Sequence, residues 1–431
     1  MLTGRKYRLK LTPEQEAQCE EFGNTCRAVW NTGLAQRRDY RRRGAWMNYI
    51  PQAAELAEAR QAFEWLRAAP SCIHQQTLRD LERACRERGT WKVHWRSKAR
   101  WAPSFRFSDA RWLKVERLNR RWARVKLPKM GWVTFRWTRP LGGDIRSATV
   151  SRRAGQWYVS FLVEDGIVTP ERHTGTPIGI DRGVAIAVAT SSGELHDRPF
   201  STLGEDRRLK RVQRAISRRK RGSANRRKAV SSYALHSARL ADRRRDFAAQ
   251  VAHALTTQHS LIVLEDLRTS DMTASAKGTP DDPGKNVRQK AGLNRAIRGK
   301  AWGRTEVALR SAARYTGTQI VKVNPAYTSQ TCYRCKAVDA ESRKRQADFV
   351  CTSCGHRDHA DVNAAKNILA AGLAVTACGD LGHTQSMKQE PATPQGRRVG
   401  SHSEPVILRI SVQEEANRSR RLGRPPVANE S

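Results

Sequence analysis

The stretch Pro177-Ile178-Gly179-Ile180-Asp181 decides the fold of the C-terminal half of this chain. A short apolar run that ends on a carboxylate is typical of a buried strand that stops at the edge of a sheet. The same pattern returns at Leu261 to Glu265. Strands are also predicted at Val184 to Thr190 and Gln319 to Val323, and a helix at Trp302 to Tyr315. Residues from about 176 onward therefore predict a sheet with helices packed around it.

This alternation of strands and helices around carboxylates predicts an RNase H-like α/β domain over residues 171–330 and 358–382. A cysteine-containing segment, residues 331–357, is inserted before its last helix. The Gly- and Pro-containing segment Asp271 to Leu293 predicts a mobile insertion or lid. Residues 383–431 are polar and without periodicity, so they are predicted to form a mostly disordered tail.

The N-terminal part of the chain predicts two further domains. Thr12-Pro13-Glu14-Gln15 has the pattern of a capping box with proline at the first helical position, and apolar residues follow at helical spacing. Residues 12–95 therefore predict a helical domain, with later helices at Ala53 to Ala68 and Ile73 to Arg88. Residues 1–11 and 96–170, where the period becomes two, predict a β-rich, barrel-like domain. The fold class is multidomain α+β.

The charge of the chain indicates its partner. Lys and Arg total 80 against 41 Asp and Glu, which gives a formal net charge of +39. Such a chain repels itself in the compact state unless a polyanion neutralises it, so nucleic acid is the expected partner. No run of about 18 apolar residues is present, and the first residues lack the apolar stretch of a signal peptide. We expect a cytoplasmic, nucleoid-associated protein that does not bind a membrane.

Four of the nine cysteines have the spacing C-x₂-C-x₁₅-C-x₂-C, and these are Cys332, Cys335, Cys351 and Cys354. In a reduced compartment this spacing predicts a structural zinc site. Four thiolates leave no open position for water, so the metal should hold the fold and not catalyse. Free cysteines, a redox pair and an iron–sulfur cluster remain alternatives. Cys19, Cys26, Cys72 and Cys85 are expected to be ordinary helix residues.

Three carboxylates stand at the edges of predicted elements. Asp181 and Glu265 end apolar strands, and Asp361 opens a helix. Acids brought together at the ends of strands can hold two Mg²⁺ ions, which activate a water and stabilise the leaving oxygen of a phosphodiester. Each acid alone fits a turn or a helix N-cap equally well. The sequence predicts Asp181, Glu265 and Asp361 as catalytic, Mg²⁺-binding residues.

Asp266 directly follows Glu265 and competes with it for this role. Successive side chains of a strand point to opposite faces, so only one of the two can face the site. Glu265 is two positions from the apolar Val263 and shares its buried face. We therefore choose Glu265 and expect Asp266 to face away.

The segment Arg207 to Lys228 holds twelve Arg or Lys in twenty-two residues. Leu209, Val212 and Ile216 would keep it docked, while the basic residues face outward toward phosphates. A solvated helix face without function is the alternative. The candidate nucleic-acid-binding residues of this segment are Arg218, Arg219, Lys220, Arg221, Arg226 and Arg227.

Several motifs together resemble the TnpB nucleases of insertion sequences, which are relatives of the type V CRISPR effectors. The resemblance is firm from about residue 145 to 372. The matching motifs are Gly179 to Val184, Ser217 to Arg226, Val263 to Leu267, Tyr327 to Cys332, Cys351 to Gly355 and Asp361 to Asn367.

This resemblance implies an RNA-guided DNA endonuclease with a RuvC-type site. Such an enzyme binds a non-coding guide RNA and cuts double-stranded DNA beside a short adjacent motif. Asp181, Glu265 and Asp361 match the family's catalytic acids. The helical domain would be the recognition lobe, with the adjacent motif read near Tyr49 and Gln75, and the β-rich domain would be the wedge domain. A monomer bound to RNA is favoured.

Three other functions remain open from the sequence. A miniature type V CRISPR effector would use the same chemistry with a CRISPR RNA. A non-cleaving RNA-guided or DNA-binding repressor would need the acids only for structure. A DDE-type transposase would share the sheet, but an inserted zinc segment fits it poorly.

Overall fold

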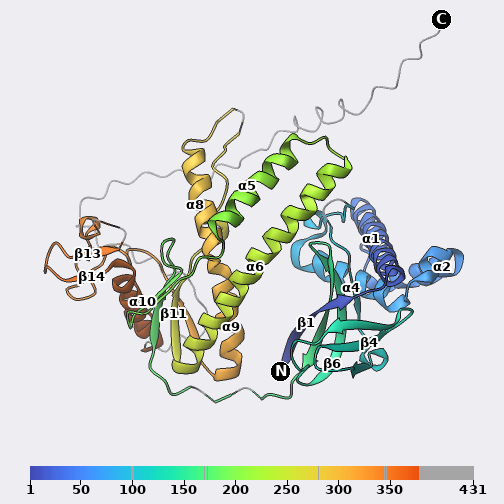
Figure 1. Ribbon diagram of the computed structural model, residues 1–431, viewed down its shortest axis with the longest axis horizontal. Helices are drawn as coiled ribbons and strands as arrows, with labels where there is room; N and C mark the ends of the chain where they lie inside the picture. Colours follow the sequence, from blue (N-terminus) through green and yellow to red (C-terminus); the bar gives the residue numbers. More distant parts are fainter. Residues whose placement is uncertain are drawn as a thin grey trace, which may run out of the picture. The chain divides into compact units, whose positions relative to one another are not determined.

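In the computed structural model the chain divides into two units, Met1–Gly382 and His383–Ser431. The structure describes residues 1–98, 101–168, 170–171, 173–279, 281–343, 345 and 347–377. The predicted tail at residues 383–431 lies outside the described residues. Figure 1 shows the elements of the first unit.

The β-rich region forms one seven-stranded antiparallel sheet with the order β2-β6-β7-β1-β5-β4-β3. Its strands are β1 (Leu2–Lys10), β2 (Ser104–Phe107), β3 (Val115–Arg117), β4 (Trp122–Leu127), β5 (Gly131–Arg136), β6 (Asp144–Arg153) and β7 (Gln156–Glu164). Burial alternates strictly along β7, where Trp157, Val159, Phe161 and Val163 are buried. This confirms the predicted period of two.

The predicted barrel-like closure is wrong. Within the described residues the sheet is open, because its order ends at β2 and β3, which do not pair with each other. β1 joins the two halves: it pairs with β7 over Leu2 to Arg8 and with β5 only at Leu9 and Lys10. Both halves contribute to one core, with Phe107 and Phe161 from one and Val125 and Phe135 from the other. The two halves of the open sheet are therefore held together by a common hydrophobic core and not by hydrogen bonds between β2 and β3.

Four helices belong to the predicted helical region: α1 (Pro13–Arg42), α2 (Tyr49–Ala62), α3 (Glu64–Ala68) and α4 (Ser71–Arg88). The capping box at the start of α1 is present, since Thr12 and Gln15 bond each other's backbone N–H. The helix predicted at Ala53 to Ala68 is divided at Phe63, whose backbone is extended. Cys19 and Phe22 of α1 and Ile73 of α4 join the core of the seven-stranded sheet.

The C-terminal region holds a five-stranded sheet with the order β10-β9-β8-β11-β12. Its strands are β8 (Ile178–Asp181), β9 (Val188–Thr190), β10 (Leu195–His196), β11 (Leu261–Glu265) and β12 (Gln319–Val323). β11 is parallel to both β8 and β12. The strand predicted from Val184 begins only at Val188, because the carbonyls of Gly183 and Ala185 accept hydrogen bonds from Trp302 and Lys300 instead of from a strand.

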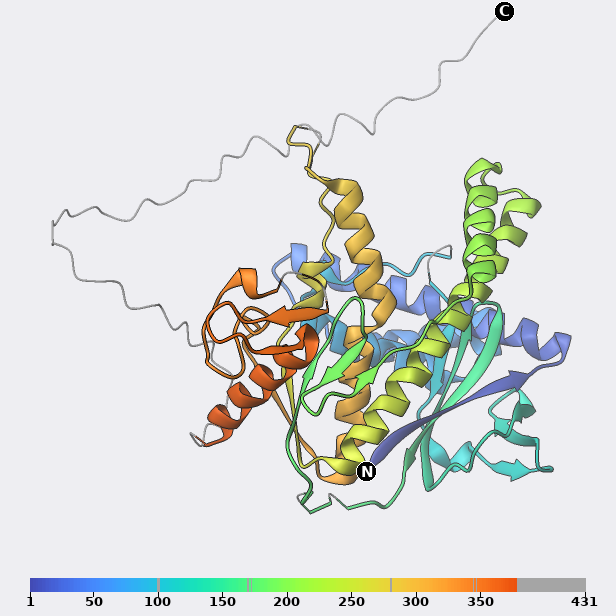
Figure 2. The same cartoon turned by 60° about the vertical axis from the view of Figure 1, so that its left-hand side comes forward.

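Helices cover both faces of this sheet (Figures 1 and 2). The helices of this region are α5 (Leu203–Arg218), α6 (Ala224–Gln258), α7 (Thr269–Met272), α8 (Val287–Lys300), α9 (Trp302–Thr316) and α10 (Ala360–Ala377), and α6, α9 and α10 are the ones that pack against the sheet. On one face, side chains of α6 and α9 such as Val251 and Leu309 pack on Ile180 and Leu264. On the other face, Ile368 of α10 packs on Val263. The predicted insertion Asp271 to Leu293 is only partly irregular, because α8 begins inside it.

Two glycines let α10 approach the sheet closely. A Cβ atom at Gly179 of β8 would lie 2.2 Å from the carbonyl oxygen of Ala365, and one at Gly372 of α10 would lie 2.3 Å from Cγ2 of Val263. Real Cβ atoms do not come that close to another atom. The helix that carries Asp361 is therefore held against the strands that carry Asp181 and Glu265 by residues without side chains.

The cysteine-containing segment between β12 and α10 carries a short antiparallel pair, β13 (Asp348–Val350) and β14 (Arg357–His359). Its small core consists of Cys332, Phe349, Cys351 and Ala360. In the part of the chain that the structure describes, no helix is both long and apolar enough to cross a membrane.

Candidate functional site

The strand register brings the first two predicted acids together. β8 and β11 are parallel neighbours in which Ile180 pairs with Leu264, so Asp181 and Glu265 follow at the same end of adjacent strands. Alternation along the strands places both on the face that α10 covers, the face of Gly179 and Val263.

Asp361 lies in the first turn of α10 and completes this group. A Cβ atom at Gly183, two residues after Asp181, would lie 3.3 Å from Oδ2 of Asp361. The side chains of Asp181, Glu265 and Asp361 thus gather at one edge of the sheet, under the N-terminus of α10. We call them the acidic site.

The electrostatics of the acidic site show how closely the three carboxylates interact. Burial, followed by the charges of Glu265 and Asp361, raises the pKa of Asp181 to about 7. Burial also raises the pKa of Glu265, which is 8% exposed. Since crowding of like charges and desolvation both oppose ionisation, the site favours a cation that would compensate the carboxylates. Three oxygen-donor side chains are a ligand set suited to Mg²⁺.

Three further residues contact the acids, and sequence reasoning missed them. The guanidinium of Arg343 donates to Oδ1 of Asp361 at 2.9 Å. The hydroxyl of Thr328 donates to Oε1 of Glu265 at 2.6 Å. The buried Arg182 donates to the main-chain carbonyl of Glu265 at 2.6 Å and pairs with Glu306 at 3.4 Å. No sequence spacing predicts these contacts, although Arg182 and Thr328 lie within motifs that carry the resemblance.

Asp266 points away from the acidic site. Its carboxylate binds Lys322 at 2.9 Å, and Lys322 also binds Glu306 of α9 at 2.8 Å. These partners lie on the α9 side of the sheet, opposite to α10. The alternation of side chains along the strand therefore places Glu265 on the side of α10 and Asp266 on the side of α9, as predicted.

The four predicted cysteines form one compact cluster. Their Sγ atoms all lie within 4.8 Å of one another. Cys332 and Cys354 are 3.8 Å apart, and Cys335 and Cys351 are 3.5 Å apart. Four sulfurs at about 2.3 Å from a tetrahedral zinc would be about 3.8 Å from each other, so the cluster has the size of a zinc site. It could hold a metal ion.

Two asparagines connect the cysteine cluster to α10. The side chain of Asn363 accepts from the backbone N–H of Tyr333 at 2.9 Å and donates to the carbonyl of Thr331 at 2.8 Å. Asn367, one turn later, donates to the carbonyls of Thr328 and Thr331. The helix that carries Asp361 is thereby fastened to the first pair of cysteines.

The basic segment covers most of α5 and the start of α6, which run side by side, and its residues 218–227 lie at the tip of the hairpin that the two helices form (Figures 1 and 2). Arg218, Lys220, Arg221 and Arg227 are exposed. Arg219 donates to the carbonyl of Asn225 at 2.7 Å, and Arg226 to that of Ile216 at 3.2 Å. These two arginines hold the turn together, so they have a structural role besides any contact with phosphates.

Tyr49 and Gln75 lie on neighbouring helices, α2 and α4. The ring of Tyr49, at the start of α2, has the guanidinium of Arg79 at 5.0 Å from its centroid. Gln75 lies one turn earlier on α4, where it is exposed and lines a cavity with Arg60 and Arg67. Tyr49 therefore contacts the helix that carries Gln75, through Arg79.

Three family descriptions match parts of the chain. Residues 1–45 match "Helix-turn-helix domain", residues 158–276 match "Probable transposase" and residues 302–368 match "Cas12f1-like, TNB domain". The first description does not fit the structure, because residues 1–45 form strand β1 and the single helix α1. The last two cover the five-stranded sheet, the cysteine cluster and the start of α10.

Two curated relatives align with most of the chain. InsQ of Escherichia coli (strain K12), whose name describes an RNA-guided DNA endonuclease, is 37% identical over 90% of this chain and 96% of InsQ. A Streptomyces pristinaespiralis protein with the same description is 33% identical over 90% of this chain and 95% of its own. The fold and the acidic site define a multidomain α+β protein with a carboxylate-bearing sheet and an inserted cysteine cluster. By these relatives, the chain belongs to the TnpB/IS605 transposase family.

A solved structure shares the fold. The Cas12f1 chain in a cryo-EM structure of the Cas12f1-sgRNA-target DNA complex matches with a TM-score of 0.53 and 11% identity. The match covers 85% of this chain and 98% of that chain.

Proposed function

We propose that this protein is an RNA-guided DNA endonuclease that hydrolyses phosphodiester bonds at the acidic site with Mg²⁺. Its two full-length relatives carry that description, and its fold is that of Cas12f1. The single observation that carries the proposal is the convergence of three acids from distant elements on one buried edge, where burial, followed by the charges of Glu265 and Asp361, raises the pKa of Asp181 to about 7.

Asp181, Glu265 and Asp361 would hold the Mg²⁺ ions, which supply charge stabilisation for the phosphodiester when bound. Thr328 orients the carboxylate of Glu265 through its hydroxyl. Arg182 fixes the main chain of the same residue from the opposite face of the sheet. Together the two contacts limit the movement of Glu265 relative to Asp181, as precise ligand geometry requires.

Arg343 is positioned to bind the DNA backbone. Its guanidinium donates to Asp361, which would itself be compensated by the metal. The guanidinium can then turn to a phosphate oxygen beside the acids, since Arg binds phosphate with parallel hydrogen bonds. Arg343 belongs to the cysteine-containing segment, so this segment contributes to the site as well as to the fold.

The remaining predicted residues would bind nucleic acid. The cysteine cluster would hold one structural Zn²⁺. The exposed residues Arg218, Lys220, Arg221 and Arg227 would contact phosphates of the guide RNA or of its duplex with DNA. The cavity beside Gln75 and the side chain of Tyr49 on the neighbouring helix would read the adjacent motif of double-stranded target DNA.

A miniature CRISPR effector would use the same residues and differ in the source of its RNA, which sequencing of the co-purifying RNA identifies. A non-cleaving repressor would leave three crowded, buried acids without a function. The guide-dependent reaction distinguishes these possibilities.

The test is cleavage of a plasmid library by the purified protein with its co-purified RNA, in Mg²⁺ and in EDTA. We expect guided cuts in Mg²⁺ only, and no cuts by Asp181→Ala, whose RNA binding should be unchanged. Cutting that persists in EDTA or in Asp181→Ala would exclude the acidic site as the seat of the reaction. Guided binding without cutting by the wild-type protein would favour the repressor.

A further inference from the structure

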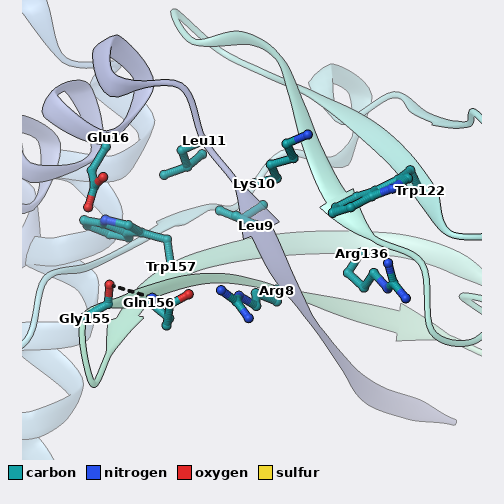
Figure 3. A pocket seen from close by; sticks show the side chains of 10 residues that line it. All are labelled: Arg8, Leu9, Lys10, Leu11, Glu16, Trp122, Arg136, Gly155, Gln156 and Trp157. Atoms are coloured by element: carbon teal, nitrogen blue, oxygen red, sulfur yellow. Dashed lines mark hydrogen bonds between the residues drawn. The ribbon is translucent and has the colours of Figure 1, made fainter. Parts of the chain in front are cut away.

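A cavity of about 480 Å³ lies on the seven-stranded sheet, and its lining includes no residue of the acidic site, the cysteine cluster or the basic segment. Its lining comes from the end of β1, the start of α1, the facing ends of β4 and β5, and the β6–β7 turn. The residues are Arg8, Leu9, Lys10, Leu11, Glu16, Trp122, Arg136, Gly155, Gln156 and Trp157 (Figure 3). A volume of this size is within the range of about 300–1,000 Å³ that small-ligand sites have.

One end of the cavity is cationic. Nζ of Lys10 and Cζ of Arg136 each lie 5.3 Å from the centroid of the Trp122 ring. Figure 3 shows these three side chains together at one end, while Arg8 lies between the two ends with its guanidinium on the side of Gln156. Among the described residues, no acid forms an ion pair or a hydrogen bond with Arg8, Lys10 or Arg136. Their mutual repulsion would be relieved by an anion, and the indole keeps two of them in place.

The other end of the cavity offers hydrogen bonds of both kinds. Trp157 is only 4% exposed, yet its indole N–H has no hydrogen-bond partner in the described part of the chain. A buried donor without a partner is costly, so it indicates a ligand or a water at that position. The carboxylate of Glu16 and the amide of Gln156 lie beside it and can accept hydrogen bonds (Figure 3).

We propose that this cavity binds a single extruded ribonucleotide of the guide RNA. Its phosphate would contact Arg8, Lys10 and Arg136, and its base or ribose would lie against Trp157 and Glu16. The inference rests on the proposed function, because it assumes that a folded RNA is the partner. No residue of the acidic site or of the basic hairpin takes part.

The chemistry of the two ends favours RNA over the other available ligands. A free phosphate would satisfy only the cationic end. A DNA duplex presents its phosphates on a continuous surface and keeps its bases stacked, whereas folded RNA exposes splayed nucleotides in loops and bulges. The carboxylate of Glu16 repels a phosphate but accepts from a 2′-hydroxyl or a base amino group. This polarity matches one ribonucleotide, with its anion at one end and its donors at the other.

The experiment uses the full chain and the RNA that co-purifies with it, transcribed and labelled. Binding is measured over a range of salt for the wild type, for Lys10→Ala/Arg136→Ala and for Trp157→Phe. The matched control is Lys114→Ala/Lys126→Ala, which removes the same charge from exposed lysines of the same sheet outside the cavity. We expect the cavity pair to weaken binding roughly tenfold more than the control pair, with a salt slope lower by about 2.

Trp157→Phe should weaken binding severalfold with an unchanged salt slope, since it removes one N–H and no charge. Probing of 2′-hydroxyl reactivity should show one or two nucleotides that the wild type protects and both cavity variants expose. Equal effects of the cavity and control pairs, or an unchanged reactivity pattern, would overturn the proposal. If Trp157→Phe does not fold, the exposed pair Lys10 and Arg136 decides the outcome alone.

The two proposals fail in distinguishable ways. If the wild type neither binds RNA nor makes guided cuts, the proposed function fails. If it does both while the cavity variants bind with the wild-type protection pattern, only this inference fails. A cavity that instead binds single-stranded DNA of the same sequence equally well would also contradict it, because Glu16 would then have no 2′-hydroxyl to recognise.

Discussion

The cysteine cluster and the acidic site are the two metal sites that we propose, and they are assembled in opposite ways. The four cysteines come from one segment of 23 residues, Cys332 to Cys354, and their Sγ atoms lie within 4.8 Å of one another. The three acids come from β8, β11 and α10, and Asp361 is held by Arg343. A local ligand set forms a closed site, whereas a set gathered from a sheet and a helix depends on packing.

The two sites are also physically connected. Thr328 and Arg343, which contact the acids, lie on either side of Cys332 and Cys335. Asn363 and Asn367 join the same region to α10. The cysteine-containing segment therefore holds residues of the acidic site in position. Because the two sites are assembled differently, we expect them to respond differently to substitution.

The largest effect is expected inside the acidic site. Glu265→Gln should lower guided cleavage by at least about four orders of magnitude, because it removes a ligand whose charge the reaction needs. Asp266→Asn is the matched control: its carboxylate is on the opposite face and half exposed, so the variant should keep most activity. Cleavage rates in Mg²⁺ measure both. Equal losses in the two variants would show that Glu265 is not the residue of this strand end that faces the acidic site.

A substitution in the cysteine cluster should lower cleavage at the acidic site indirectly. Purified protein should hold about one Zn²⁺ per chain, and Cys351→Ser should lose it together with several kcal/mol of local stability. Arg343 and Thr328 would then lose their positions, so cleavage should fall as well. Cys85→Ser, in α4, is the control and should keep its zinc. Elemental analysis with thermal melting tests this, and an active, folded protein that contains iron or no metal would contradict it.

The sequence predicts the local features of both sites well. The cysteines follow from their spacing, and β8 and β11 follow from short apolar runs that end on a carboxylate. Contacts that depend on packing are not predictable in this way. Arg343 and Asp361 are 18 residues apart and Thr328 and Glu265 are 63 apart, and no periodicity links them.

The errors in the fold have similar causes. A period of two identifies strands but not which edges pair, so the seven-stranded sheet was expected to close like a barrel. The start of β9 was misplaced because Lys300 and Trp302 bind the carbonyls that a longer strand would use. The helix α8 was missed because the Gly and Pro residues before it end at Gly284, and the segment was assigned as a whole.

A smaller effect is expected when only the packing of α10 on the sheet is changed and the three acids are kept. Gly179→Ala leaves every ligand in place but puts a Cβ atom 2.2 Å from the carbonyl of Ala365. We expect a loss of about 3 kcal/mol in the free energy of unfolding and a displaced α10, with weaker Mg²⁺ binding as a result. Gly292→Ala is the control, since its Cβ would meet nothing within 4 Å in α8; it should raise stability by up to about 1 kcal/mol. Chemical denaturation measures both, and similar stabilities would show that α10 does not pack as tightly as described.

The last expected effect is on the pH dependence of stability without metal. The pKa of Asp181 is raised to about 7 from an ordinary 3.8, mainly by burial and then by Glu265 and Asp361. Between these values the native state holds a proton that the unfolded state has lost, so stability should fall as pH rises through this window. The two pKa values differ by an amount that corresponds to at most about 4 kcal/mol.

Asp181→Asn removes this penalty, because the amide cannot ionise. In EDTA the variant should melt a few degrees above the wild type at pH 8, and the difference should vanish at pH values well below 3.8, where Asp181 is protonated in both states. Mg²⁺ should reverse the order at pH 8 by binding only the wild type. The cysteine cluster should not change over this comparison if its zinc is retained. A variant that melts below the wild type in EDTA at pH 8 would show that the carboxylates do not repel each other, and that Asp181 is a structural acid rather than a ligand kept ready for a metal.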